Sequence, residues 1–163
     1  MTRNYRPGGP LRPVTFMVRA SDASTYGLHS TDFTGDNTRD DVQIQQAIDL
    51  LPTQGGEVYL SDGNFTIGDT VDCGVKRVAV RGAGMGITTL KLSNSANTSL
   101  INFGNSTTVT GGGGLYNLTI NGNSANNTSG LGLRIQGCTD IDIVNVYATD
   151  FDLEGIYIDG ASG

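Results

Sequence analysis

The sequence has no tryptophan, one histidine and only two cysteines among its 163 residues. Disulfide scaffolds of this length use many more cysteines, so we expect Cys73 and Cys138 to be free, buried thiols. No apolar run approaches the ~20 residues needed to cross a bilayer, which predicts no membrane span. Only 16% of the residues are charged, whereas 24 are glycine. This composition favours a turn-rich β protein over a helical or disordered chain.

Charge is distributed unevenly along the chain. Four arginines precede the first acidic residue, Asp22, so residues 1–20 carry +4 and the remainder carries −6 − 4 = −10. One interpretation is a basic attachment arm, with Arg3, Arg6 and Arg12 docking on another protein. The alternative is a flexible tail whose arginines only keep it hydrated. The acidic body argues against nucleic acid as a partner, because wrapping nucleic acid requires clustered basic side chains.

The stretch from Gly35 to Leu60 predicts a short amphipathic helix followed by the first of many strands. Its apolar stripe has helical spacing, and comprises Ile44, Ala47, Ile48 and Leu51. We expect Thr38, Asp40 and Asp41 to cap the N-terminus of this helix. Because these acids lack the ligand spacing of a calcium loop, we predict no metal site and no cofactor.

The rest of the chain is repetitive. Residues 132–137 recur as residues 155–160, a shift of 23, and residues 116–120 recur as residues 144–148, a shift of 28. A looser pair, residues 78–82 and 100–104, is offset by 22. Short alternating strands at such periods indicate a solenoid, in which each coil buries its inner face by stacking on its neighbours. A parallel β-helix fits best, and the glycines at 111–114 predict a turn rather than a strand.

These motifs also carry a family resemblance. The segments 35–60, 63–67 and 80–84, preceded by residues 18–24, resemble the start of right-handed β-helix proteins of the pectate-lyase-like superfamily. They look most like bacteriophage tailspikes and tail fibres and prokaryotic β-helix repeat proteins. The implied fold class is all-β, a right-handed parallel β-helix solenoid with a short N-terminal capping α-helix. We expect an arm and first strand at 1–20, a loop and the capping helix at 21–56, and coils at 57–163.

The last two coils carry the candidate functional residues. Alternation of strand side chains places Arg134 beside Tyr157 and Gln136 beside Asp159 on the outer surface, with pairs about 4.8 Å apart. An aromatic ring next to charged and amide groups is typical of a carbohydrate site. Three acids precede the last strand, and are weak candidates for glycosidic acid–base chemistry: Asp150, Asp152 and Glu154.

The functional hypothesis rests mainly on the resemblance. It implies a non-enzymatic structural or adhesion component of a phage tail that contacts host surface polysaccharide. Such a component would self-associate as a homotrimer, bind other tail proteins through the arm, and occur in the virion or outside the cell. The alternatives are a polysaccharide lyase or glycoside hydrolase of the same superfamily, or a secreted prokaryotic surface protein. No catalytic motif of the superfamily is found in the sequence.

Overall fold

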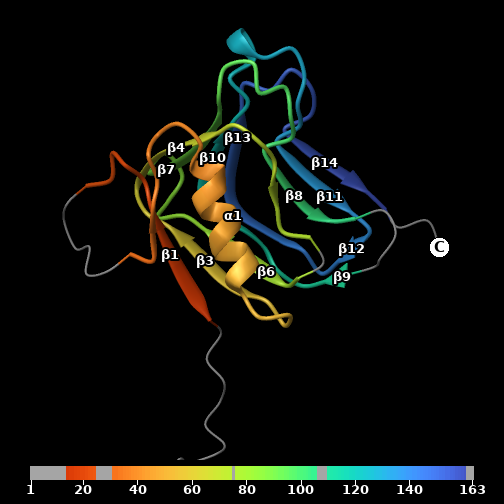
Figure 1. Cartoon of the computed structure of the whole chain (residues 1–163). Helices are drawn as coiled ribbons and strands as arrows, with labels where there is room; N and C mark the ends of the chain where they lie inside the picture. The colour runs from red at the N-terminus through yellow and green to blue at the C-terminus, as the bar shows by residue number, and fades with distance from the viewer. Residues whose placement is uncertain (1–13, 25–30, 75, 106–109, 161–163) are drawn as a thin grey trace, which may run out of the picture.

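The computed structural model describes residues 14–24, 31–74, 76–105 and 110–160 (Figure 1). Within these ranges the chain forms short strands, one α-helix and one 3-10 helix. In chain order the elements are β1 (Thr15–Arg19), β2 (Phe33–Thr34), α1 (Asp40–Leu50), β3 (Gly56–Leu60), β4 (Gly63–Ile67), β5 (Val71–Asp72), β6 (Val78–Arg81), β7 (Thr88–Leu92), β8 (Ile101–Gly104), β9 (Thr110–Gly111), β10 (Gly114–Asn121), η1 (Ser124–Asn126), β11 (Leu133–Gln136), β12 (Cys138–Thr139), β13 (Asp142–Thr149) and β14 (Ile156–Asp159).

The strands of successive coils pair in parallel. The largest sheet has the order β2-β1-β3-β6-β10-β7-β4, with β13 also paired to β10, and a second sheet has the order β14-β11-β8-β5. A short pair joins β12 to β9. Figure 1 shows β1, β3, β4 and β7 on the left and β8, β11 and β14 on the right, with the chain winding between them. The predicted all-β parallel β-helix is therefore confirmed.

The long strands β10 and β13 each bend once, at an asparagine. Asn117 has a φ of 55° and Asn145 a φ of 52°, a left-handed conformation that asparagine tolerates better than most residues. The side-chain amide Nδ2 of Asn145 donates to Oδ1 of Asn117 at 3.0 Å, so the two bends stack. The first half of β10 consequently pairs with β6, whereas its second half pairs with β7.

The core lies inside the coils, and its side chains form columns that follow the strand register. Fully buried columns, each read from one coil to the next, are Val58–Val80–Leu115, Phe65–Leu90–Ile120 and Val71–Ile101–Leu133. Each inner face is covered because the next coil stacks on it. Cys73 belongs to this core and is a free thiol, as predicted. Cys138, predicted to be buried, is only half-buried, and its thiol donates to the carbonyl oxygen of Gln136 at 3.4 Å.

The helix α1 covers the first coil, as its apolar stripe predicts. Ile44, Ala47, Ile48 and Leu51 are all buried, with no more than 3% of any of them exposed. Because α1 lies against β1, β4 and β5, these side chains complete the core at that end of the stack. The capping helix of the prediction is thus confirmed.

The N-terminal capping residues were predicted wrongly. Arg39 is the N-cap residue, and its side chain makes no capping hydrogen bond. Asp40 is fully buried and accepts instead from three backbone N–H groups outside the helix, those of Asp36 at 2.8 Å, Asn37 at 2.9 Å and Thr66 at 2.7 Å. Its carboxylate therefore ties the loop before α1 to β4.

The partners of Asp41 also lie outside the helix. Its Oδ1 accepts from the backbone N–H of Gly68 at 2.8 Å, and its carboxylate forms an ion pair with Arg39 at 2.8 Å. The hydroxyl of Thr38 donates to Asp36 rather than capping a helical N–H. Local spacing favoured capping, but the nearby coils offered these carboxylates other donors.

Two further predictions were wrong. The 22-residue offset does not describe stacked strands, because β6 pairs with β3 and β10 while β8 pairs with β5 and β11. The glycines at 111–114 are not purely a turn, since Gly111 ends β9 and Gly114 begins β10. Gly114 has a φ of 152°, and a Cβ there would collide with the carbonyl oxygen of Asp142. Glycine lets two adjacent coils approach closely at this position.

The predicted arm falls outside the described residues. Arg3, Arg6 and Arg12 belong to residues 1–13, so their attachment role stays a prediction, as do the domain boundaries. In the part of the chain that the structure describes, no helix is both long and apolar enough to pass through a membrane.

Candidate functional site

The outer face of β5, β8, β11 and β14 carries the residues that the sequence predicted. The register places Arg134 opposite Tyr157 and Gln136 opposite Asp159, as expected. On its other side Arg134 lies opposite Asn102, which in turn lies opposite Asp72. We call the row Asp72, Asn102, Arg134 and Tyr157, together with Gln136 and Asp159, the outer row. Sequence reasoning missed Asp72 because β5 is only two residues long, and missed Asn102 because the 22-residue offset assigned its strand to a different stack.

The polar groups of the outer row are incompletely paired. Nδ2 of Asn102 donates to Oδ1 of Asp72 and to the carbonyl oxygen of Gly104, both at 3.1 Å. Oδ1 of Asn102 and Nε of Arg134 are shielded from solvent and have no hydrogen-bond partner among the described residues. Leaving a buried donor or acceptor unpaired costs about 1–3 kcal/mol, so these two atoms lower the stability of the free protein.

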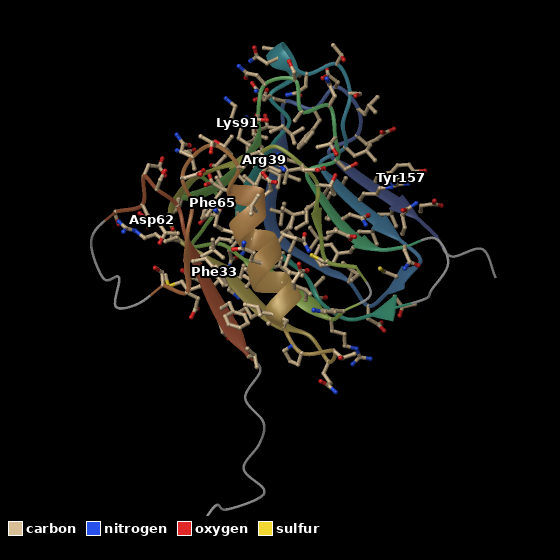
Figure 2. All side chains as sticks on the ribbon, viewed as in Figure 1. Phe33, Arg39, Asp62, Phe65, Lys91 and Tyr157 are labelled. Atoms are coloured by element: carbon tan, nitrogen blue, oxygen red, sulfur yellow. The ribbon has the colours of Figure 1, made fainter. Side chains whose placement is uncertain are left out.

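The tyrosine at the end of the outer row is accessible. Tyr157 is 37% exposed, and Figure 2 shows its side chain projecting from the right-hand edge of the molecule. Beside it, Nε2 of Gln136 lies 3.5 Å from Oδ2 of Asp159, which is a long contact. The exposed ring can stack on one face of a sugar, and the amide and carboxylate groups beside it can form hydrogen bonds with the hydroxyls of that sugar.

The three candidate acids do not form one cluster. The carboxylate of Asp150 accepts from Nδ2 of Asn121 at 2.8 Å and lines a hollow beside Lys91, away from the outer row. Asp152 and Glu154 are exposed in the turn that leads to β14, and neither side chain has a hydrogen bond or ion pair with the described residues. Their catalytic role stays a prediction.

A second polar network lies on the outer face of β3, β6, β10 and β13. Nε of Arg81 donates to Oε2 of Glu57 at 3.0 Å, and its guanidinium lies 4.4 Å from the centre of the Tyr116 ring. The hydroxyl of Tyr116 donates to Oδ2 of Asp142 at 3.0 Å. Burial, and then the Asp142 carboxylate, raises the pKa of Tyr116. Because each charge is already paired, this network links four coils rather than presenting free groups.

A hollow of about 350 Å³ lies beside the first turns of α1. Its cation is Arg39, whose hydrogen bond and ion pair with Asp41 raise the pKa of the guanidinium. The Asp41 carboxylate also accepts from the backbone N–H of Gly68. The Arg39 guanidinium and the Asp41 carboxylate are therefore already paired within the fold. Among the described residues, no group of three or more histidine, cysteine, aspartate or glutamate side chains is placed to hold a metal ion.

Fold and outer surfaces together define a parallel β-helix protein with polar faces. No protein-family model matches the chain, and neither does any curated protein. Among solved structures, the chain is similar to the A-module of the mannuronan C-5 epimerase AlgE6 from Azotobacter vinelandii, with 29% identity and a TM-score of 0.54. The match covers 68% of this chain and 34% of that structure.

This similarity bears on the competing functional hypotheses. The chain spans about a third of the length of the epimerase module, matching 34% of it, so activity and substrate are matters for proposal. The name of the module describes action on a polysaccharide. The comparison therefore supports the polysaccharide-modifying alternative better than the phage-tail hypothesis, whose virion location, homotrimer and tail partners stay predictions.

Proposed function

We propose that the chain is part of a polysaccharide-modifying β-helix protein and binds a uronate-containing polysaccharide along the outer row. The similarity to a mannuronan epimerase module supports this class of ligand, because mannuronan is a polymer of an acidic sugar. The outer row supplies groups suited to such a polymer. Arg134 would hold a sugar carboxylate, because a guanidinium pairs with carboxylates through two parallel hydrogen bonds.

The remaining members of the outer row would read the sugar ring and its hydroxyls. Tyr157 offers an exposed aromatic face, and Asn102, Gln136 and Asp159 offer amide and carboxylate groups. Stacking of coils places these groups about 4.8 Å apart along the solenoid, so successive coils can contact one extended chain. The acidic chain, with a net charge of −6, needs such a local cation to attract a polyanion.

The observation that carries the proposal is the register of the outer row, which places Arg134 between Asn102 and Tyr157. These residues belong to neighbouring strands and lie in the same row. A guanidinium, an amide and an aromatic ring in one row are suited to a ligand bearing both a carboxylate and hydroxyl groups. Asp152 and Glu154, in the turn before β14, stay candidates for acid–base chemistry on the bound sugar.

The test is calorimetric titration of the chain with oligomannuronate of defined length. We expect Arg134→Gln to weaken binding about 10-fold or more, since it removes a charge-assisted contact. Tyr157→Ala should also weaken binding while leaving thermal stability nearly unchanged. A matched control is Arg77→Gln, which removes the same charge from an exposed residue outside the outer row. Equal binding by Arg134→Gln and Arg77→Gln, or equal affinity for neutral mannan oligomers, would refute the proposal.

A further inference from the structure

A second polar hollow lies at the corner where the first sheet turns toward the second. Its volume is about 250 Å³. It is lined by the ends of β7 and β10, the start of η1 and the residue after β13, namely Lys91, Asn121, Asn123, Ser124, Ala125 and Asp150. We call it the corner hollow. Figure 2 shows Lys91 high on the molecule and Tyr157 at its right-hand edge, so the corner hollow and the outer row are separate surfaces.

The floor of the corner hollow is rigid. Asn123 is only 8% exposed, and its Nδ2 donates to the carbonyl oxygen of Leu92 and to Oδ1 of Asn94, both at 3.0 Å. Its backbone N–H donates to Oδ1 of Asn121 at 2.7 Å, and its Oδ1 accepts from Asn126 at 3.0 Å. Asn123 therefore has no spare polar group. It fixes the shape of the hollow rather than adapting to a ligand.

One wall of the corner hollow presents a carboxylate in a fixed position. Oδ2 of Asp150 accepts from Nδ2 of Asn121 at 2.8 Å, and the carbonyl oxygen of Asp150 accepts from the backbone N–H of Ser124 at 3.0 Å. These contacts hold residue 150 between two coils. Oδ1 of the carboxylate accepts no hydrogen bond from the described residues and can accept from a ligand hydroxyl.

The other wall presents an unpaired cation. Lys91 is exposed, and its ammonium group forms no hydrogen bond or ion pair with the described residues. The hydroxyl of Ser124 also forms no hydrogen bond with the described residues, and it can donate to or accept from a ligand. The corner hollow thus combines a free positive charge, a hydroxyl and an anchored carboxylate around one small cavity.

We propose that the corner hollow binds one uronate unit of an acidic polysaccharide. The ligand carboxylate would pair with Lys91, and its ring hydroxyls would donate to Asp150 and exchange hydrogen bonds with Ser124. A bare phosphate or sulfate fits this site poorly, because its negative charge is not separated from its other oxygens and would lie against the Asp150 carboxylate. A neutral hexose would leave Lys91 unpaired. The hollow has a volume of about 250 Å³, whereas pockets for drug-sized ligands have roughly 300–1,000 Å³. The smaller volume suits a single sugar ring.

This inference takes its ligand class from the proposed function but concerns a different face and different residues. The two can therefore fail separately. Loss of oligomannuronate binding in Lys91→Gln but not in Arg134→Gln would support the corner hollow and refute the outer row, and the reverse result would refute the corner hollow.

The direct test is titration of the ¹⁵N-labelled chain with D-mannuronate, followed by amide chemical shifts. We expect shifts at Asn123, Ser124 and Asp150, and an affinity about 10-fold lower in Lys91→Gln, as loss of a charge-assisted contact implies. Asp150→Asn should also weaken binding, because a neutral amide oxygen accepts more weakly from the sugar hydroxyls than a carboxylate does. Lys91 is exposed, so its substitution should not disturb the fold.

The controls are D-mannose, inorganic phosphate and the variant Arg77→Gln. D-mannose and phosphate should bind more weakly than D-mannuronate, and Arg77→Gln should bind like the unmodified chain. An absence of shifts at Ser124 and Asn123, equal binding of D-mannose or phosphate, or unchanged affinity in Lys91→Gln would each overturn the inference.

Discussion

The first coil and the last described coil bury their inward-facing side chains to very different extents. At the first coil, Ile44 and Ile48 of α1 are at most 2% exposed. At the last coil, Ile156 and Ile158 continue the buried column of Leu133 and Ile135, yet they are 40% and 67% exposed. The residue type and the inward direction are the same. What differs is whether another of the described elements stacks on the coil.

The comparison shows that inward direction alone does not bury a side chain in a solenoid. A coil is covered only by its neighbour, and α1 serves as that neighbour for the first coil. Substitutions at the covered end should therefore lower the free energy of unfolding more than matched substitutions at exposed positions.

Ile48→Asp should lower the free energy of unfolding by about 4 kcal/mol or more, because it places an unpaired charge in the core. Ile158→Asp should cost less than about 1 kcal/mol, since the side chain is already 67% exposed. Urea unfolding followed by circular dichroism measures both. Similar costs for the two substitutions would mean that α1 does not cover the first coil.

Asp40→Asn should lower the free energy of unfolding by about 3 kcal/mol, because the new amide group would face N–H donors that the carboxylate now satisfies. The matched change Asp159→Asn should cost less than about 0.5 kcal/mol, as expected for an exposed surface site. Thermal unfolding of the two variants, at the same pH, provides the measurement. A neutral Asp40→Asn would contradict the anchoring role of this carboxylate.

Lys76→Met should cost about 1–2 kcal/mol of unfolding free energy, because the ammonium group pairs with carbonyl groups at the C-terminal end of α1. Its Nζ donates to the carbonyl oxygens of Ile48 at 3.0 Å, Asp49 at 2.9 Å and Leu51 at 3.0 Å. Arg77→Met, at the exposed neighbouring residue, is the control for charge. Equal stability of the two variants would argue against a capping role for Lys76.

Substitution of Tyr116, which lies between the covered and exposed ends, should have the smallest effect on the free energy of unfolding. Burial raises its pKa, with a smaller contribution from Asp142, so the folded state favours the neutral phenol. This contribution to stability is complete below the ordinary tyrosine pKa of about 10 and is lost as the pH rises through the folded-state pKa. Unfolding free energies measured across this alkaline range should fall less steeply in Tyr116→Phe. Asp142→Asn should retain most of the wild-type slope, because burial is the main cause.

Several features could be predicted from residues close together in the sequence. The stripe Ile44, Ala47, Ile48 and Leu51 indicated the helix and its buried face, and the 23-residue and 28-residue shifts identified strands that do stack. Alternation within β11 and β14 was sufficient to place Arg134 beside Tyr157. These features follow from helical and strand periodicity, which is a local property of the chain.

Other features depended on partners distant in the sequence. The donor for Asp40 from Thr66 is 26 residues away, and the donor for Asp150 from Asn121 is 29 residues away. The break in alternation at Asn117, where Leu115 and Leu118 both face inward, was a readable signal of the bend in β10. No comparable signal pointed to the corner hollow, because its lining comes from three coils.

The sequence by itself determined that this protein is a parallel β-helix with a helix covering the first coil, since periodicity and apolar patterning are written along the chain. Only the tertiary structure decided that β6 and β8 belong to separate stacks, that Asp40 and Asp41 bind neighbouring loops rather than cap α1, and that Lys91 and Asp150 meet at one hollow. The physical reason is that these contacts form between coils. Their geometry depends on the bend and register of strands that lie 20 to 30 residues apart in the sequence.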